Sequence, residues 1–444
     1  MQRTLIKNAR LVNEGQIRDA DVLVAGERIE KVDSGISADD ATVIDAEGKY
    51  LIPGMIDDQV HFREPGLTNK GDLATESAAA AAGGITSFMD MPNVNPQTTT
   101  REALADKHGI AEGRCTSNYG FYLGATNSNI EQIKALQVNE GCGIKAFMGA
   151  STGDMLVDDP AALELLFEHA PVLVVTHCEH SPTIQDNEAK ARAQYGEDVP
   201  MSEHPNIRSA QACLVSSSLA TDLARRHDAL LHVLHLTTAI EMSLFSKAHH
   251  NDKRITAEVC VHHLWFDDSQ YESKGSHIKW NPAVKQASDR DGLWKALLDG
   301  RLDVVATDHA PHTLEEKSNK YLNAPSGGPL VQHALPAMME RVHDGVWDIQ
   351  TMVEKMCHNP AILFRMEDRG YIREGYHADL VLLEPNRPWK VSKDNILYKC
   401  QWSPFEGTVF KSKVTHTFVN GHLAFKEGNF DDSQLGERLL FNRD

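Results

Sequence analysis

Histidine and aspartate side chains follow several short apolar runs in this sequence, in a pattern that could assemble a metal site. Four such residues, each near the C-terminal side of a separate apolar run, are His61, His177, His235 and Asp308. Neutral imidazole and carboxylate groups are ligands that Zn²⁺ and similar borderline cations accept. A single histidine after a strand is usually a hydrogen-bonded structural residue, but four such positions together favour a metal centre.

Lys145 lies within the apolar segment GIKAFMGAS (143–151), where a charged side chain is unusual. Burying an ammonium group costs several kcal/mol unless it is paired, and burial lowers its pKa. A neutral amine can take up CO₂ to form a carbamate, which bridges two cations as a carboxylate does. The alternative is that the stem packs in the strand while the ammonium extends to solvent, and Lys145 considered alone would favour it.

Three polar side chains near these positions suit a substrate carboxylate. Arg63 follows His61 by two residues, so both side chains point to the same face of an extended segment. Asn93 ends another apolar run, and His312 lies four residues after Asp308. Arginine suits bidentate binding of a carboxylate, although a surface salt bridge is the alternative for Arg63.

These residues require a scaffold that brings the ends of many strands together. Helical stretches alternate with short β-branched apolar runs over about 300 residues, which favours a parallel sheet with crossover helices. Most of the apolar runs lead into His, Asp, Asn or Lys: 55–62, 85–93, 143–151, 172–180, 230–238, 255–263 and 304–312. In a (β/α)₈ barrel the catalytic residues lie at the C-terminal ends of the strands, so a barrel predicts one shared site.

Both ends of the chain differ from this middle part. They contain short alternating strands separated by turn residues, for example the hairpin dipeptide Asn420-Gly421. We therefore predict an α/β fold in two parts. Residues 55–365 form a (β/α)₈ TIM barrel, and residues 1–54 plus 366–444 form one small β-sandwich domain.

Composition limits the partners of the chain. Lys and Arg total 44 against 63 Asp and Glu, a net charge of −19, which argues against nucleic acid and anionic membranes as partners. Seven widely spaced cysteines without a CxxC motif indicate reduced thiols rather than a disulfide framework or a cysteine zinc site. No apolar run approaches the ~18 residues of a membrane span, and the first residues lack an apolar signal segment. We expect a cytoplasmic protein that acts on a small molecule.

Six motifs together resemble the dihydroorotases, within the amidohydrolase superfamily. They are IPGMIDDQVHFREPG (52–66), MPNVNP (91–96), AEVCVHH (257–263), NPAVK (281–285), ATDHAPHT (306–313) and APSGGPL (324–330). HFREPG and TDHAPH are highly specific as a pair, and the resemblance extends from about residue 1 to 425. It implies a barrel that carries a small β domain from both termini. It also implies a zinc-dependent cyclic amide hydrolase of pyrimidine synthesis, which reversibly converts N-carbamoyl-L-aspartate to L-dihydroorotate plus water.

The resemblance also implies a set of metal ligands, with one departure. The family pattern HxH reads Gln59-Val60-His61 here, so a weaker amide oxygen replaces the first imidazole. Lys145 matches the carboxylated lysine of some members, and Asp154 is the alternative because some bacterial relatives use an aspartate bridge. With His177, His235 and Asp308, this set fits one or two zinc ions per subunit. His232 is expected to be a supporting or structural residue.

The substrate assignments follow in the same way. Arg63, Asn93 and His312 correspond to the residues that hold the α-carboxylate of dihydroorotate, and Asn281 and the Gly327-Gly328 backbone to those that contact the ring amides. Lys285 is a weaker candidate because NPAVK departs from the commoner NPPLR. Allantoinases and hydantoinases lack an arginine at the position of Arg63, so Arg63 favours a ring that bears a carboxylate.

The resemblance also implies a mechanism, and two alternative functions remain open. Bound zinc lowers the pKa of water from about 15.7 to about 7, and Asp308 is expected to act as general base and then as general acid. One alternative is a hydantoinase- or allantoinase-like hydrolase. Another, permitted by Gln59, is a non-catalytic homologue that scaffolds aspartate transcarbamoylase, although the retained Lys145 and Asp308 weigh against it. We expect a homodimer, with aspartate transcarbamoylase as a candidate partner.

Overall fold

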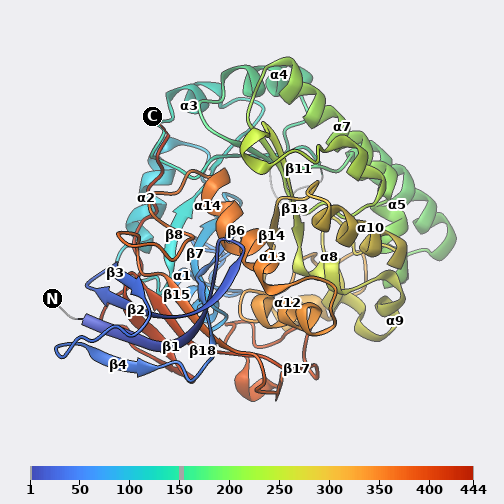
Figure 1. The fold of residues 1–444 in the computed structure, drawn as a ribbon. Coiled ribbons are helices and arrows are strands. Elements are labelled where there is room, and N and C mark those ends of the chain that lie inside the picture. Colours follow the sequence, from blue (N-terminus) through green and yellow to red (C-terminus); the bar gives the residue numbers. More distant parts are fainter. Residues whose placement is uncertain (1–2, 150–154, 444) are drawn as a thin grey trace.

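The computed structural model of the chain describes residues 3–149 and 155–443, and its centre is a barrel of parallel strands enclosed by helices (Figure 1). The barrel strands are β6 (Met55–Val60), β7 (Ile85–Asp90), β8 (Asn118–Phe121), β9 (Leu123–Gly124), β10 (Ile144–Phe147), β11 (Val174–His177), β12 (Leu231–Val233), β13 (Ile255–Cys260) and β14 (Val304–Ala306). Only Tyr122 separates β8 from β9, so the two share one position and the strands occupy eight positions. A parallel bridge between Val60 and His309 closes the ring.

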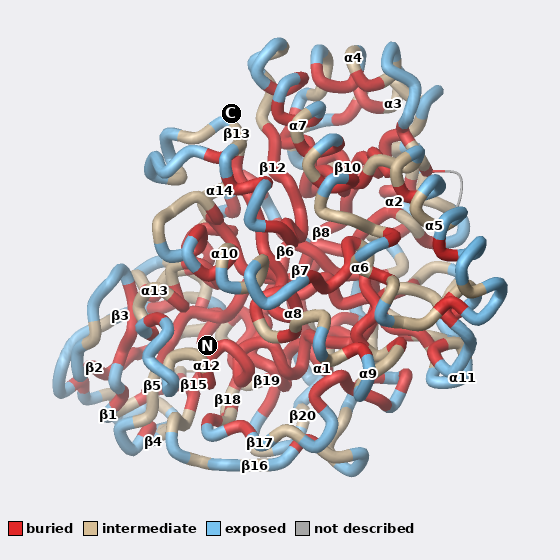
Figure 2. Tube along the Cα trace, turned by 90° about the vertical axis from the view of Figure 1, so that its right-hand side faces the viewer, coloured by how far each residue is buried: buried red, intermediate tan, exposed pale blue. Residues whose placement is uncertain are grey.

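Helices cover the outside of these strands. The longer ones are α1 (Leu73–Ala82), α2 (Arg101–Ala111), α4 (Pro160–His169), α5 (Ser181–Tyr195), α7 (Ala210–Arg226), α10 (Ala287–Leu298) and α12 (Ala334–His343). The shorter ones are α3 (Ile130–Ala135), α6 (His204–Ile207), α8 (Val261–Trp265), α9 (Tyr271–Lys274), α11 (Leu314–Lys317), α13 (Ile349–Val353) and α14 (Asn359–Leu363). Because helices and the barrel interior cover both faces, every residue of β6, β7, β10 and β11 is buried (Figure 2).

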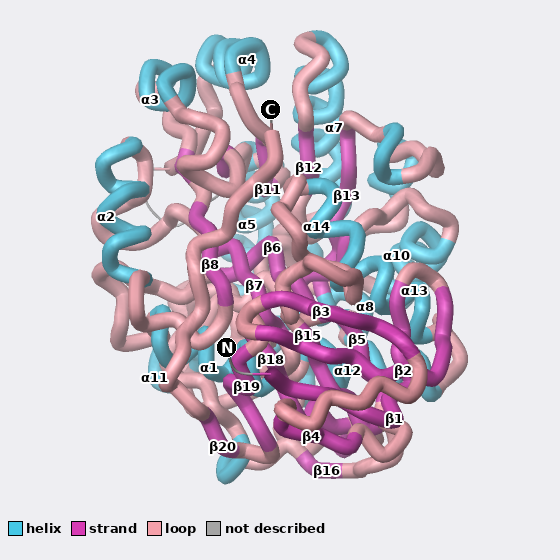
Figure 3. Tube along the Cα trace, turned by 60° about the vertical axis from the view of Figure 1, so that its left-hand side comes forward, coloured by secondary structure: helices cyan, strands magenta, loops and turns pink. Residues whose placement is uncertain are grey.

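Strands from both ends of the chain form a second, nine-stranded sheet (Figure 3). Its members are β1 (Arg3–Asn13), β2 (Gln16–Ala25), β3 (Arg28–Asp33), β4 (Thr42–Asp45), β5 (Tyr50–Pro53), β15 (Leu380–Glu384), β18 (Lys413–Val419), β19 (His422–Lys426) and β20 (Asn429–Phe430), and β16 (Trp389–Lys390) pairs separately with β17 (Val409–Phe410). The two ends meet where β5 pairs antiparallel with β15. The predicted fold class, a TIM barrel carrying a β domain from both termini, is confirmed.

The last described residues leave this sheet and lie against the barrel. Leu439 donates its backbone N–H to the carbonyl of Tyr119 at 2.8 Å, and its side chain is buried. The Arg443 guanidinium donates to the carbonyls of Val138 and Gly141 at 3.0 and 2.9 Å. Among the described residues, no helix combines the length and apolar character that a membrane span requires. All seven cysteines are buried and unpaired.

Candidate metal and substrate site

A cavity at the C-terminal ends of the barrel strands brings most of the predicted site residues together. Six metal-ligand and six substrate-binding residues were predicted, and eleven of these twelve line the cavity: Gln59, His61, Arg63, Asn93, Lys145, His177, His235, Asn281, Asp308, His312 and Gly327. Gly328 and Lys285 do not line it, and Asp154 lies outside the described residues. Residues from all around the barrel therefore converge on one point, as strand ends in a closed barrel must.

His177 and His235 present two imidazole nitrogens to the same point. Nδ1 of His177 lies 3.0 Å from Nε2 of His235. On its other side, the Nε2 of His177 lies 3.0 Å from a carboxylate oxygen of Glu179, so this nitrogen carries the proton and Nδ1 is left with a lone pair. Burial lowers the pKa of both imidazoles and keeps them neutral, the form that binds a metal. The pair fits a cation between the two rings.

Glu179 was missed by the sequence reasoning, although it stands only two residues after His177. Its carboxylate is fully buried and pairs with Arg208, and this arginine and His177 hold its pKa at about 2 despite the burial. Carboxylates that accept from the second nitrogen of a ligating histidine fix its orientation and raise its basicity. Glu179 is therefore a positioning residue for His177.

Replacing Glu179 by glutamine should weaken metal binding at the His177–His235 pair by about 10- to 100-fold. Glutamine keeps the shape but removes the negative charge that orients the imidazole. Competition with a chromophoric chelator would measure the change in Kd. A variant that binds metal as tightly as the unaltered protein would show that Glu179 serves only Arg208.

The opposite side of the cavity holds His61, Asp308 and Gln59. Nε2 of His61 lies 3.3 Å from Oδ1 of Asp308, while Nδ1 of His61 contacts the side-chain oxygen of Asn93 at 2.7 Å. The side-chain amide of Gln59 donates to the same Asp308 oxygen at 3.1 Å. Burial raises the pKa of the Asp308 carboxyl. Asn93 thus supports His61 as well as facing the cavity.

Lys145 on β10 lines the same cavity. Its side chain is buried, and its Nζ lies 4.6 Å from the centre of the Phe147 ring. Burial lowers the pKa of this ammonium, with Asp308 and Glu258 opposing the shift. The structure thus excludes the alternative in which the ammonium extends to solvent. A lysine with a lowered pKa inside a set of metal-binding groups suits carbamate formation.

A positively charged corner of the cavity is built around Arg63. Its guanidinium is buried, donates from Nε to the carbonyl of Pro311 at 3.0 Å, and lies 3.1 Å from Nε2 of His312. Burial lowers the pKa of Arg63 to about 10, so it stays protonated, and lowers that of His312 to about 3, so it stays neutral. Lys70 lies 3.2 Å from Nδ1 of His312, and the Ser326 carbonyl lies 3.1 Å from its Nε2. This corner suits an anion.

Backbone geometry at the site is unusual. Arg63, His235 and Asp308 have φ angles of +71°, +39° and +47°, in the left-handed region that side chains other than glycine rarely adopt. Such conformations cost about 1–3 kcal/mol each and persist where the surroundings enforce them, often at functional sites. Gly327 has a φ of +126°, and a Cβ there would lie 2.6 Å from the carbonyl oxygen of Ala310. The side chains of Arg63, His235 and Asp308 line the cavity from these positions, and at Gly327 only a residue without a Cβ fits.

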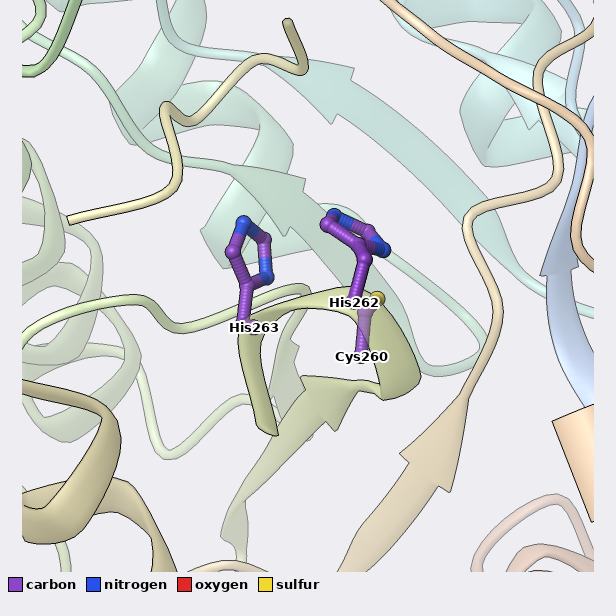
Figure 4. Close-up of side chains that lie close together, drawn as sticks. All are labelled: Cys260, His262 and His263. Carbon is purple, nitrogen blue, oxygen red and sulfur yellow. The ribbon is translucent and has the colours of Figure 1, made fainter. Parts of the chain in front are cut away.

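A group of three potential ligands, Cys260, His262 and His263, lies behind the cavity wall (Figure 4). The rings of His262 and His263 project to the same side of the chain where β13 passes into α8. His262 stacks on Trp280 with 4.3 Å between ring centres, and His263 contacts the carbonyl of Pro282 at 3.1 Å. The Cys260 thiol lies 3.8 Å from the side-chain oxygen of Gln59. This group packs against Trp280 in the cavity wall, and its thiol contacts Gln59.

Comparisons with known proteins agree with this geometry. The amidohydrolase family pattern matches residues 50–424. The chain is 32% identical over 414 residues to a dihydroorotase of Halobacterium salinarum, covering 91% of this chain and 92% of that protein. It is also 32% identical over 432 residues to one of Carboxydothermus hydrogenoformans, covering 95% and 98%.

Solved structures show the same fold. An L-hydantoinase (dihydropyrimidinase) from Arthrobacter aurescens superposes with a TM-score of 0.93 at 27% identity, covering 99% of this chain and all of that one. A dihydropyrimidinase from Brevibacillus agri superposes with a TM-score of 0.91 at 26% identity, covering both chains completely. The resemblance inferred from the six sequence motifs is confirmed, and the chain belongs to the amidohydrolase family.

Proposed function

We propose that the chain catalyses the reversible hydrolysis of L-dihydroorotate to N-carbamoyl-L-aspartate. One observation carries this proposal: a buried, protonated Arg63 shares the cavity with the His177–His235 pair. A cyclic amide held at the histidines can therefore place a carboxylate against the guanidinium. The dihydroorotase names of relatives that match more than nine-tenths of the chain support the same activity.

We propose Zn²⁺ as the cofactor, because neutral imidazoles with oxygen donors are a set it favours. The residues that would hold it are His61, Lys145, His177, His235, Asp308 and Gln59, for one or two ions. Zinc bound there would lower the pKa of water to about 7 and would polarise the scissile carbonyl.

The side chains provide the remaining chemistry. Asp308, fixed by His61 and Gln59, would take a proton from the attacking water and deliver it to the ring nitrogen that leaves. Arg63 and His312 would bind the substrate carboxylate, and burial would strengthen that contact. Asn281 and the backbone of Gly327 would hold the ring amides. Ring closure would use the same groups in reverse.

A hydantoinase-like activity is the second candidate, because the solved structures named above carry hydantoinase or dihydropyrimidinase titles. The two candidates differ in the substrate carboxylate. Hydrolysis of L-dihydroorotate, hydantoin and dihydrouracil should be measured on one zinc-loaded preparation, before and after chelation and after zinc is restored. We expect turnover of dihydroorotate, lost on chelation and recovered with zinc. Turnover of hydantoin alone would favour the second candidate, and no turnover at all would favour a non-catalytic scaffold.

Lys145 should carry a carboxyl group on Nζ when bicarbonate and metal are present. Its burial and lowered pKa make the neutral amine available to CO₂. A crystal structure of protein prepared with bicarbonate and zinc would show the added density at Nζ. Acidic mass spectrometry is unsuitable because carbamates decompose in acid. A bare amine beside a fully loaded metal site would contradict the prediction and favour Asp154 as the bridge.

Changing Gln59 to histidine should raise occupancy of the metal bound near His61. An amide oxygen is a weaker metal ligand than an imidazole, and each ~1.4 kcal/mol changes Kd tenfold. We therefore expect the unaltered protein to bind this metal about a hundredfold more weakly than a protein with histidine at position 59. Zinc per chain after dialysis at graded free-zinc concentrations would measure both sites. The prediction would be contradicted if the unaltered protein bound two zinc ions with equal affinity and Gln59→His did not increase the zinc content.

The predicted homodimer, the cytoplasmic location and a complex with aspartate transcarbamoylase are part of the same proposal. Sedimentation of the pure protein, alone and mixed with the transcarbamoylase, would test the two assemblies. A monomer that does not comigrate with the transcarbamoylase would contradict both the homodimer and the complex.

A further inference from the structure

One layer below the catalytic cavity, three buried side chains converge inside the barrel. Asp58 on β6, His232 on β12 and Glu258 on β13 are all completely inaccessible to solvent. Nε2 of His232 lies 3.3 Å from Oδ2 of Asp58 and 3.8 Å from Oε2 of Glu258. One potential ligand atom from each of the three residues lies within 4.8 Å of the other two. We call these residues the floor cluster.

The atoms that face the centre of the floor cluster lack hydrogen-bond partners. Both carboxylate oxygens of Asp58, Oε2 of Glu258 and Nε2 of His232 make no hydrogen bond with any described residue. Although His232 is close to Asp58, the contact does not have hydrogen-bond geometry. Leaving several buried polar atoms unpaired is costly, most of all for charged groups, so a partner is expected there.

The outward-facing atoms of the floor cluster are held firmly. Nδ1 of His232 lies 2.7 Å from the hydroxyl of Thr256, and that hydroxyl donates to the carbonyl of Leu231 at 3.3 Å. The hydroxyl proton is used there, so Nδ1 is the donor to Thr256. Burial opposes a charge on His232, but the carboxylates of Asp58 and Glu258 raise its pKa to about 9, so a cation that binds here would displace the proton from Nε2. Oε1 of Glu258 accepts from the backbone N–H of His235 at 3.0 Å. Hydrogen bonds of this kind normally fix the orientation of metal ligands.

We propose that the floor cluster binds a divalent cation of the zinc type, separate from the catalytic metal. Bonds of about 2.0–2.1 Å in a tetrahedral site place ligand atoms about 3.3–3.4 Å apart. Nε2 of His232 lies 3.3 Å from Asp58 and 3.8 Å from Glu258, so a small inward shift of Glu258 would complete the site. Two carboxylates and a neutral imidazole balance the charge of the ion. Both oxygens of Asp58 are unpaired, so a bidentate Asp58 with Glu258 and His232 would fill all four positions, as in structural zinc sites, and the site would fill during folding.

The floor ion would support the catalytic centre through the backbone. Glu258 reaches the main chain of His235, whose φ of +39° needs external support. The ion would therefore fix the position from which His235 faces the cavity. The proposal stands on the floor cluster alone and does not depend on the substrate of the cavity above.

Metal analysis after selective stripping tests this proposal. Protein expressed with zinc would be dialysed under native conditions against dipicolinate, which reaches the open cavity but not the inaccessible floor cluster. We expect about one zinc per chain to remain although the cavity zinc is lost. Asp58→Asn removes a charged ligand, so it should raise the Kd of the floor cluster for zinc at least about a hundredfold. The variant should therefore lose this zinc in the same dialysis. Glu241→Gln is a matched control, since that buried carboxylate is hydrogen-bonded to Ser217 and Thr238 outside the cluster, and it should keep the ion.

Anomalous diffraction at the zinc edge decides the result even if a variant fails to fold. Crystals of the stripped, unaltered protein should show a peak bonded to Asp58, His232 and Glu258. Stripped and folded protein without zinc, or zinc retained equally in Asp58→Asn, would overturn the proposal. A map with no peak, in which a protonated His232 bridges the carboxylates, would do the same.

Discussion

Replacing Asp308 by asparagine should lower kcat for dihydroorotate hydrolysis by about 10²–10⁴-fold, the contribution of a positioned acid or base. Asparagine fills the same space and can still accept from the amide of Gln59, but it cannot take a proton from water. Zinc content measured beside the rate would separate a chemical loss from loss of metal, because the His177–His235 pair is unaltered.

Glu241→Gln again serves as the control, since it neutralises a buried carboxylate away from the cavity and should retain most of its activity. A zinc-loaded Asp308→Asn enzyme that keeps more than about a tenth of the normal kcat would contradict the role of Asp308 as general base and acid.

Replacing Arg63 by methionine should lower kcat/KM for dihydroorotate by about 10²–10³-fold. Removing one partner of a buried, hydrogen-bonded charge pair costs about 2–5 kcal/mol, and each ~1.4 kcal/mol is a factor of ten. Arg63→Lys should recover part of this loss, because it restores the charge without the bidentate geometry.

The Arg63 variants should lose activity on dihydroorotate but not on a substrate that lacks the carboxylate. Dihydrouracil has the same ring without the carboxylate, so its kcat/KM should stay within a few-fold in the same variants. Parallel losses on both substrates would show that Arg63 supports the fold of the cavity, through its bond to the Pro311 carbonyl, rather than binding the carboxylate.

Much of the site could be predicted because strands in a closed barrel leave little freedom. A polar residue at the end of an apolar strand must lie at the mouth, and His177, His235 and Asp308 do line the cavity there. Gly328 does not line the cavity, because it packs against Trp280 and Trp402, and a Cβ there would lie 2.7 Å from the Trp280 ring. The sequence does not reveal whether a loop glycine faces a ligand or a neighbouring ring.

Other features depend on contacts between distant residues. Glu179 could have been suspected from its spacing to His177, but its ion pair with Arg208 joins two different connecting segments, one after β11 and one after α6. The left-handed backbone at Arg63 and Asp308 follows from the surrounding packing and not from residue type. The floor cluster combines positions 58, 232 and 258, which no local pattern connects. We keep the division into 1–54 plus 366–444 and 55–365 as a proposal, which limited proteolysis would test through cleavage near its boundaries.

The pairing of β5 with β15 has a consequence for synthesis on the ribosome. Pro53 pairs with Leu380, so the hydrogen-bonding edge of β5 has no partner until the ribosome has synthesised β15, 327 residues later. At about 5–20 residues per second, this edge stays open for roughly 15–65 s in each nascent chain. An unpaired strand edge is a template for association with other chains. Pulse-labelled ribosome-bound intermediates should therefore be the aggregation-prone species, and holdase chaperones should bind them before residue 384 is made.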